Sequence, residues 1–115
     1  MIQRLHTGDL VSRAVIHNNI VYVSGLTATD KTKDIDEQTR EVLARVDGVL
    51  AEAGSDKSRI LTATIWLADF ADKDAMNKAW TSWLPSGAAP ARAATQAELG
   101  AGVLVEIMVQ AACGG

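Results

Sequence analysis

Apolar residues recur along the chain in two rhythms, which together predict five strands and two helices. Residues 11–17 and 20–25 are rich in β-branched side chains and are separated only by Asn18-Asn19, so they predict a hairpin with a short turn. Residues 60–67 predict a third strand with two distinct faces, because side chains alternate across a strand. Its core face would hold Leu61, Ala63, Ile65 and Leu67, and its opposite face Ile60, Thr62, Thr64 and Trp66.

Two segments show the three- and four-residue spacing of amphipathic helices. The first runs over about residues 36–53, where acidic side chains suit the N-terminus and Gly54 suits the C-terminal cap. The second follows a polar turn at residues 69–74 and ends before Pro85. The apolar stripe of the second helix, which indicates a core contact, is Ala75, Met76, Ala79, Trp80 and Trp83. The polar face of the first helix, interpreted as solvated, includes Arg40, Glu41, Arg45 and Glu52.

The C-terminal part of the chain predicts two more strands, over residues 90–97 and 103–109, with glycines between them. If they formed a hairpin centred on Leu99, Arg92 would lie opposite Glu106 and point to the same face. One interpretation of this pair is a structural cross-strand ion pair, which contributes little to stability. The other is a binding site, because arginine matches the two oxygens of a carboxylate and glutamate can polarise a water molecule.

This order of elements predicts an α+β fold in one domain, residues 1–115, with two helices packed on one face of a single mixed β-sheet. So small a chain has no further element to cover the other face of the sheet. Both faces of the strand at 60–67 have core-like character. We therefore expect the uncovered face to pack against a symmetry-related copy.

Composition narrows the function classes without selecting one. The net charge is −3 and the pI about 5.2, which disfavours nucleic acid as a partner. Two histidines and one cysteine are too few for a metal-ligand cluster at known spacings, so no metal or other cofactor is expected. Cys113 has no partner for an internal disulfide, which is typical of a reducing compartment. No apolar run is long enough to span a membrane and the N-terminus lacks a signal-peptide core, so we expect a cytoplasmic protein.

Two further positions could be either structural or functional. Ser24-Gly25 closes the second strand, and Gly25 is either a plain strand end or a place where the backbone is open to a ligand. Asn77 lies off the apolar stripe of its helix, so it is either a surface residue or a polar group directed at a site. The pattern of residues alone leaves both choices open.

The chain resembles the RidA/YjgF family in an ordered series of short motifs that spans nearly its whole length. Each motif is weak alone, and the order and spacing of the set carry the resemblance. The matching positions are residues 21–25 (VYVSG), 38–39 (QT), 50–54 (LAEAG), Asp69, 76–77 (MN), 90–92 (PAR) and 105–107 (VEI). Within the family the YoaB-like subgroup is most similar, through residues 15–19 (VIHNN), 55–61 (SDKSRIL) and 76–80 (MNKAW).

The resemblance implies a chorismate-mutase-like α+β fold and a homotrimer with sites in the clefts between subunits. For the best-understood branch it implies hydrolysis of reactive enamines and imines to 2-keto acids and ammonia. The substrates of that branch are of the 2-aminoacrylate, 2-iminopropanoate and 2-iminobutanoate type. Arg92 would hold the substrate carboxylate and Glu106 would assist the water, while Ser24, Gly25 and Asn77 would line the cleft.

Three positions depart from the pattern of the family. Val11 stands where active deaminases usually carry a tyrosine, Ala94 where they usually carry a cysteine, and Leu26 where a glutamine commonly follows the glycine. The carboxylate-binding residues are kept, whereas part of the polar wall is lost. Val11 and Ala94 thus favour an alternative function, a non-catalytic module that binds a keto acid or a related small carboxylate. A third class is action on RNA or on another protein, and the acidic pI weighs against RNA.

Overall fold

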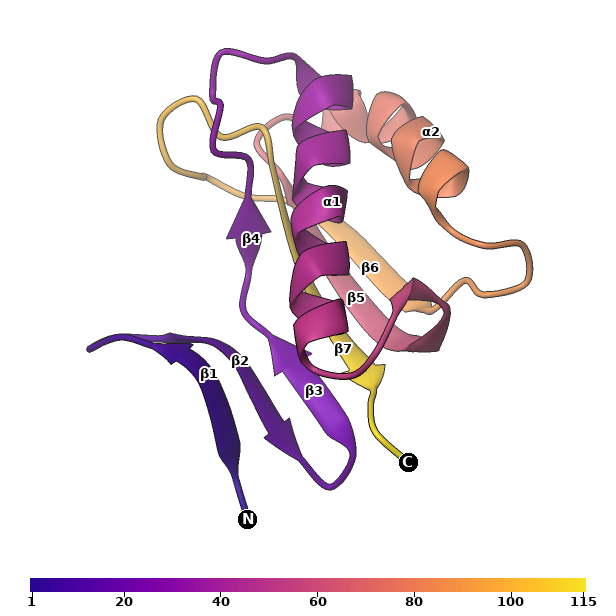
Figure 1. Cartoon of the computed structure of the whole chain (residues 1–115). Helices are drawn as coiled ribbons and strands as arrows, with labels where there is room; N and C mark the ends of the chain where they lie inside the picture. Colours follow the sequence, from indigo (N-terminus) through magenta and orange to yellow (C-terminus); the bar gives the residue numbers. More distant parts are fainter.

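The structure, a computed structural model that describes residues 1–115, has two layers: a sheet, and two helices that cover one of its faces (Figure 1). The strands are β1 Gln3–Thr7, β2 Ser12–His17, β3 Ile20–Val23, β4 Leu26–Thr27, β5 Ile60–Leu67, β6 Ala91–Gln96 and β7 Val105–Ala112. The helices are α1 Ile35–Glu52 and α2 Lys73–Trp83, with short 3-10 turns η1 Lys57–Arg59 and η2 Phe70–Asp72. The prediction of one sheet with both helices on one face is confirmed.

The strands lie side by side in the order β1-β2-β3-β7-β5-β6, and the short strand β4 also pairs with β7. Neighbours are antiparallel except β5 and β6, which run parallel, so the sheet is mixed as predicted. A parallel pair needs a crossover connection, and α2 provides it as the chain passes from β5 to β6. The strands at the two edges of the sheet are therefore β1 and β6.

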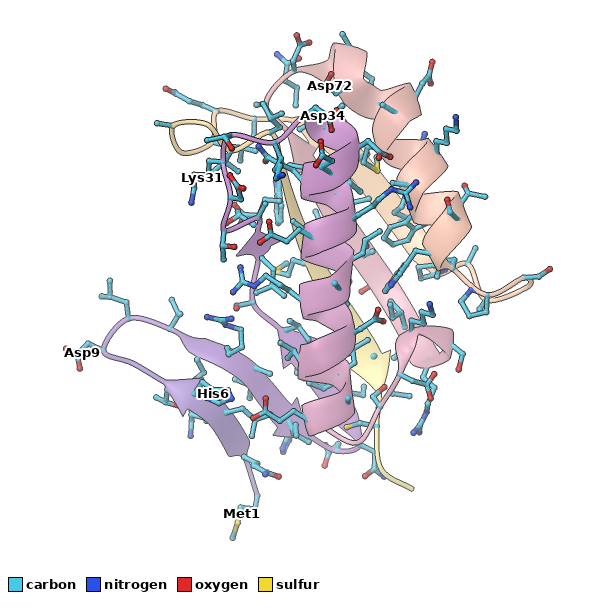
Figure 2. The ribbon with its side chains drawn as sticks, turned by 45° about the horizontal axis from the view of Figure 1, so that its top comes forward. Met1, His6, Asp9, Lys31, Asp34 and Asp72 are labelled. Atoms are coloured by element: carbon cyan, nitrogen blue, oxygen red, sulfur yellow. The ribbon has the colours of Figure 1, made fainter.

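Helix α1 begins and ends within one residue of its predicted limits. Its N-cap is Asp34, whose carboxylate accepts a 2.9 Å hydrogen bond from the Glu37 amide. Just beyond its C-terminus Gly54 has a φ of +76°, which glycine adopts without strain. Figure 2 shows Asp34 at the same end of the molecule as Asp72, the N-cap of α2, so both helices begin there. Neither helix combines the length and the apolarity that crossing a bilayer requires.

The hydrophobic core lies between the helices and the sheet. Along β7 buried and half-buried residues alternate, because every second side chain faces the helices. Side chains that are fully buried in this layer include Leu43, Leu50, Ile65, Met76 and Ile107. Burial of each such side chain stabilises the fold by roughly 1.5–3 kcal/mol. The core thus determines which residues of each strand point toward the helices and which point away.

One end of β5 differs from its predicted alternation. Leu61 is 46% exposed, whereas Ile60 is buried. The pairing of β5 with β7 shifts register between Ile60 and Thr62, and such an irregularity changes the face to which the preceding residues point. The rest of the predicted core set, Ala63, Ile65 and Leu67, does face the core.

The C-terminal hairpin predicted from the sequence does not form. Instead β5 lies between β6 and β7, parallel to the first and antiparallel to the second. β7 buries alternate side chains over eight residues and takes hydrogen-bonding neighbours on both sides, whereas β6 has no buried residue and suits an edge. The buried Gln38 side chain holds the connection between them, since it donates to the Gly102 carbonyl and accepts from the Leu104 amide at 3.0 Å each.

Strand β1 was not predicted. Four of its five side chains are exposed, so it lacks the alternation that marks a half-buried strand. It pairs with β2, and His6 Nε2 lies 2.6 Å from Glu52 Oε2 at the end of α1. Figure 2 shows His6 on this strand and Asp9 at the turn that follows it. Its pairing with β2, the contact of His6 with Glu52 and a 2.9 Å hydrogen bond between the hydroxyl groups of Thr7 and Ser12 hold β1 at the edge of the sheet.

Candidate functional site

A cleft opens where the chain leaves β3 and enters β4. Ser24 and Gly25 form this link, and the Ser24 amide donates a 2.9 Å hydrogen bond to the Arg13 carbonyl of β2. The cleft has a volume of about 390 Å³, a size that suits a small molecule. Its lining residues are Val11, Arg13, Ser24, Gly25, Leu26, Thr27, Arg45 and Glu106. Three of the predicted site residues, Ser24, Gly25 and Glu106, therefore lie together.

Gly25 leaves room for the carboxylate of Glu106. A Cβ atom built on Gly25 would overlap Glu106 Oε2 and lie 3.1 Å from Glu106 Cδ. Glu106 is level with Thr27 on β4 and Trp66 on β5, and its side chain leaves the sheet on the face without helices. None of the three ion pairs of the chain involves Glu106. The carboxylate is therefore available to a water molecule or a ligand.

Arg92 lies on the other face of the sheet, beneath α2. It is level with Ala63 of β5, whose side chain faces the core. The guanidinium carbon of Arg92 stands 5.4 Å from the centre of the Trp80 ring, within the range of a cation–π contact. Burial lowers the pKa of Arg92 from its ordinary value, and an arginine remains charged despite such a shift. The contact with Trp80 holds the cation at the edge strand.

Asn77 belongs to the same cluster, because it precedes Trp80 by one helical turn and the two share a face of α2. Its Oδ1 is buried and has no hydrogen-bond partner. A buried acceptor without a partner costs about 1–3 kcal/mol. This atom is thus suited to accept a hydrogen bond from a group that the chain itself does not supply. Ala94, two residues after Arg92, is half-buried on the same face of β6.

The predicted pairing of Arg92 with Glu106 is wrong. β5 lies between their strands, and the two side chains leave opposite faces of the sheet, Arg92 toward α2 and Glu106 away from it. None of the three ion pairs includes Arg92. The structural ion pair considered from the sequence therefore does not exist, and a single chain does not bring the two residues to one site.

Two arginines that sequence reasoning missed line the cleft beside Glu106. Arg45, interpreted from its helix face as solvated, is half-buried and donates a 2.6 Å hydrogen bond from Nη1 to the Thr27 carbonyl. Arg13 is half-buried on β2, and its only signal in the sequence is a charge inside a largely apolar strand. The cleft thus contains two guanidinium groups and one carboxylate. It favours an anion although the net charge of the chain is −3.

The side chains of the cleft offer proton transfer and anion binding. Glu106 supplies a carboxylate, Ser24 a hydroxyl group and the two arginines their cations. No three His, Cys, Asp or Glu side chains gather in an arrangement that could hold a metal ion. Cys113 is buried in the core and does not line the cleft, so its thiol takes no part there.

Known proteins resemble the chain over nearly all of its length. The model of the family described as Endoribonuclease L-PSP matches residues 1–113. A RutC family protein of Haemophilus ducreyi is 43% identical over 113 residues, which cover 97% of each chain. The RutC family protein YoaB of Escherichia coli is 50% identical over 88 residues, 76% of each chain. The crystal structure of NMB1025, a YjgF family protein of Neisseria meningitidis, matches with a TM-score of 0.96 at 37% identity, over 100% of this chain and 97% of that one.

Two further relatives have names that state an activity. The 3-aminoacrylate deaminase RutC of Acinetobacter baylyi is 34% identical over 88 residues, 71% of this chain and 69% of that protein. The chloroplastic Reactive Intermediate Deaminase A of Arabidopsis thaliana is 32% identical over 91 residues, 74% of this chain and 48% of that protein. The match to the YjgF structure confirms the chorismate-mutase-like fold. With the family model and these relatives in agreement, the chain belongs to the RidA/YjgF family and has YoaB among its relatives.

Proposed function

We propose that the protein is a deaminase that hydrolyses reactive 2-imino acids, and the enamines in equilibrium with them, to 2-keto acids and ammonia. The expected substrates are of the 2-aminoacrylate/2-iminopropanoate and 2-iminobutanoate type. The observation that carries the proposal is the unpaired carboxylate of Glu106 in a cleft that favours anions. The two relatives named as deaminases support the same class of reaction.

The residues of the two clusters suit the steps of this reaction. Water adds its oxygen to the imine carbon, the C=N bond breaks, and the nitrogen leaves as ammonia with both protons of the water. Glu106 accepts a proton from the water and passes it to the nitrogen. Arg92 binds the substrate carboxylate with its planar guanidinium. Ser24 and Asn77, whose Oδ1 has no partner within the chain, orient the nitrogen and the water by hydrogen bonds.

The proposed site lies between two copies of the chain, because Arg92 and Glu106 leave opposite faces of the sheet within one copy. One copy contributes Glu106 with Ser24 and Gly25. Its neighbour contributes Arg92 from the edge strand β6 and Asn77 from helix α2. A homotrimer would close this head-to-tail arrangement with three equivalent sites.

The sheet face without helices supports such an assembly. It carries the half-buried side chains of Trp66, which is level with Glu106, and Met108, which is level with Thr64. It also carries Tyr22, which is 41% exposed. Large apolar side chains grouped on an open surface are typical of an interface with another chain. Contact through this face would also bring the cleft of one copy close to a neighbour.

A second candidate function is a module that binds a keto acid or a related carboxylate without turnover. Two observations favour it: Val11 at the cleft is 64% exposed, and Ala94 stands near Arg92. Neither side chain can donate or accept a proton. Such a module would keep the affinity that Arg92 provides and would not need Glu106 as a base.

The test generates imines from alanine and 2-aminobutyrate with an amino-acid oxidase and follows imine loss with and without this protein. Glu106→Gln and Arg92→Ala should each lose turnover. After the two variants are mixed and allowed to exchange subunits, about one quarter of the sites of a random trimer regain both side chains. Activity should then return in the mixture, while each variant mixed only with itself stays inactive.

Three outcomes of this experiment separate the alternatives. Failure of the mixture to regain activity, with subunit exchange verified by mass spectrometry, would contradict a site shared between copies. Absence of imine hydrolysis, together with tight binding of 2-ketobutyrate in a calorimetric measurement on the same preparations, would favour the binding module. Full activity of Glu106→Gln alone would remove Glu106 from the mechanism.

A further inference from the structure

Arg13 is placed in the cleft by its strand and has no partner there. Its carbonyl accepts the 2.9 Å hydrogen bond from the Ser24 amide, which ties its backbone to the residue next to Gly25. Its side chain lines the same cleft as Glu106 and is half-buried. None of the ion pairs or side-chain hydrogen bonds of the cleft uses the Arg13 guanidinium. A half-buried cation without a partner is a group that a bound anion would complete.

The other half-buried arginines show how this one differs. Each of them has a partner group within the chain: the Thr27 carbonyl for Arg45, the Gly114 carbonyl for Arg59 and the Trp80 ring for Arg92. Arg13 is also not neutralised by Glu106, since no ion pair forms between them. The cation and the carboxylate of this cleft are therefore both available to a ligand, on the same side of the proposed site.

We propose that Arg13 binds a second anionic group of the substrate, so that the site prefers 2-imino dicarboxylic acids over monocarboxylic ones. This inference rests on the proposed function and extends its substrates, within the 2-imino acids, from monocarboxylic to dicarboxylic ones. Arg92 of a neighbouring copy takes the carboxylate next to the imine carbon, and Glu106 serves the water at that carbon. Arg13 takes the carboxylate at the end of the substrate side chain. Val11 has no polar group that would compete for that carboxylate.

The reaction remains the same hydrolysis and needs no further reactant. Water oxygen bonds to the imine carbon, and the C=N bond breaks. Ammonia leaves with the imine hydrogen and both protons of the water, and a 2-keto dicarboxylate remains. The terminal carboxylate is unchanged throughout, so its contact with Arg13 contributes to recognition and not to bond breaking.

The test compares two imine classes in wild type, Arg13→Gln and Arg13→Lys. Oxidases acting on aspartate and glutamate supply the dicarboxylic imines, and oxidases acting on alanine and 2-aminobutyrate supply the others. The wild type should show a higher kcat/KM for the dicarboxylic class. Arg13→Gln should lower the ratio of the two kcat/KM values by about 10- to 100-fold, as expected for loss of a hydrogen bond to a charged group. Arg13→Lys should retain part of the preference, because it keeps the charge but not the planar fork.

Arg40→Gln is the matched control, because it removes the same charge from an exposed position on α1, where Arg40 pairs only with Asp36. It should leave the ratio as in the wild type. A wild type without preference, or an Arg13→Gln variant with an unchanged ratio, would overturn the assignment. An equal fall of kcat/KM for both imine classes would also overturn it, since Arg13 would then act on Glu106 and not on the substrate side chain.

A binding measurement keeps this inference separate from the proposed function. Calorimetry with 2-ketoglutarate and 2-ketobutyrate reports on recognition whether or not imines are hydrolysed. Tighter binding of 2-ketoglutarate by the wild type, lost in Arg13→Gln and kept in Arg40→Gln, would support the role of Arg13 even if no imine were turned over. Equal affinity for the two keto acids in the wild type would contradict it, even if imine hydrolysis were found.

Discussion

Replacing Gly25 with alanine should remove most of the activity while leaving the stability of the fold nearly unchanged. Gly25 is not among the glycines with a positive φ, so alanine can adopt the same backbone conformation. The added methyl group would overlap Glu106 Oε2 and approach Glu106 Cγ at 3.3 Å. The group that has to move is the far end of a flexible side chain. The Glu106 side chain is therefore pushed away from its preferred rotamer, and the backbone stays in place.

This contact sets the size of the loss of activity and of the change in stability. The carboxylate has to move by about 1 Å or more, and a displacement of that size at a catalytic group lowers rates by about 100-fold. A 100-fold loss corresponds to about 2.7 kcal/mol of activation free energy. A glycine-to-alanine change at a compatible position stabilises by about 0.4–1 kcal/mol. An off-rotamer side chain costs about 0.5–1.5 kcal/mol, so the two terms nearly offset each other.

The assay measures imine loss and urea unfolding on the same preparations of wild type and Gly25→Ala. Gly48→Ala is the matched control, because a Cβ on Gly48 of α1 meets nothing within 4 Å. It should stabilise by about 1 kcal/mol through helix propensity and leave turnover unchanged. Full activity of Gly25→Ala would refute the placement of Glu106 in the mechanism. A loss of stability above about 2 kcal/mol would show that the backbone and not the side chain has moved.

Substitutions at three further residues test other parts of the structure. Arg92→Lys should lose most of the affinity for 2-ketobutyrate, and Arg92→Ala should lose about 2–4 kcal/mol of binding free energy, because only the guanidinium fork matches a carboxylate. Calorimetry showing the same affinity as the wild type would contradict the binding of the substrate carboxylate by Arg92. Hydrogen bonds from Thr29 lower the pKa of Glu41 from its ordinary value, so the stability that Glu41 contributes is present at neutral pH and is lost as the pH falls through the lowered pKa. Urea midpoints between pH 7 and pH 3 should therefore fall more steeply for the wild type than for Glu41→Gln, and parallel curves would refute this. Trp83→Phe removes the 2.9 Å hydrogen bond to Asp47 and should lower the free energy of unfolding by about 1 kcal/mol with turnover unchanged; an unaltered urea midpoint would show that the bond contributes nothing.

Local patterns in the sequence were sufficient for the elements whose formation depends on near neighbours. Helix α1 was predicted within one residue because its cap, its acidic first turn and its apolar spacing all lie within the segment itself. Strand β5 was predicted at its observed limits because its run of apolar and β-branched residues also lies within the segment itself. The resemblance to the RidA/YjgF family also came from the sequence alone, since the order and spacing of short motifs survive without any knowledge of strand pairing.

Strand pairing and the faces of the sheet were decided only in the tertiary structure. The hairpin rule favours strands that are adjacent in the chain, and it paired Arg92 with Glu106. In the fold the crossover through α2 places β6 parallel to β5 at an edge, and β7 takes the position between β5 and β3. Arg92 and Glu106 consequently leave opposite faces.

The two arginines of the cleft were not predicted for the same reason, because their position also depends on contacts between distant segments. Arg13 comes from β2 and Arg45 from α1, and they line the same cleft because the sheet and the helix pack together there. Residue spacing within one segment contains no information about such contacts between distant segments. The sequence by itself determined both helices, five of the seven strands and the family. Only packing determined which charges share a cleft, because burial of apolar side chains selects strand order over the whole chain at once.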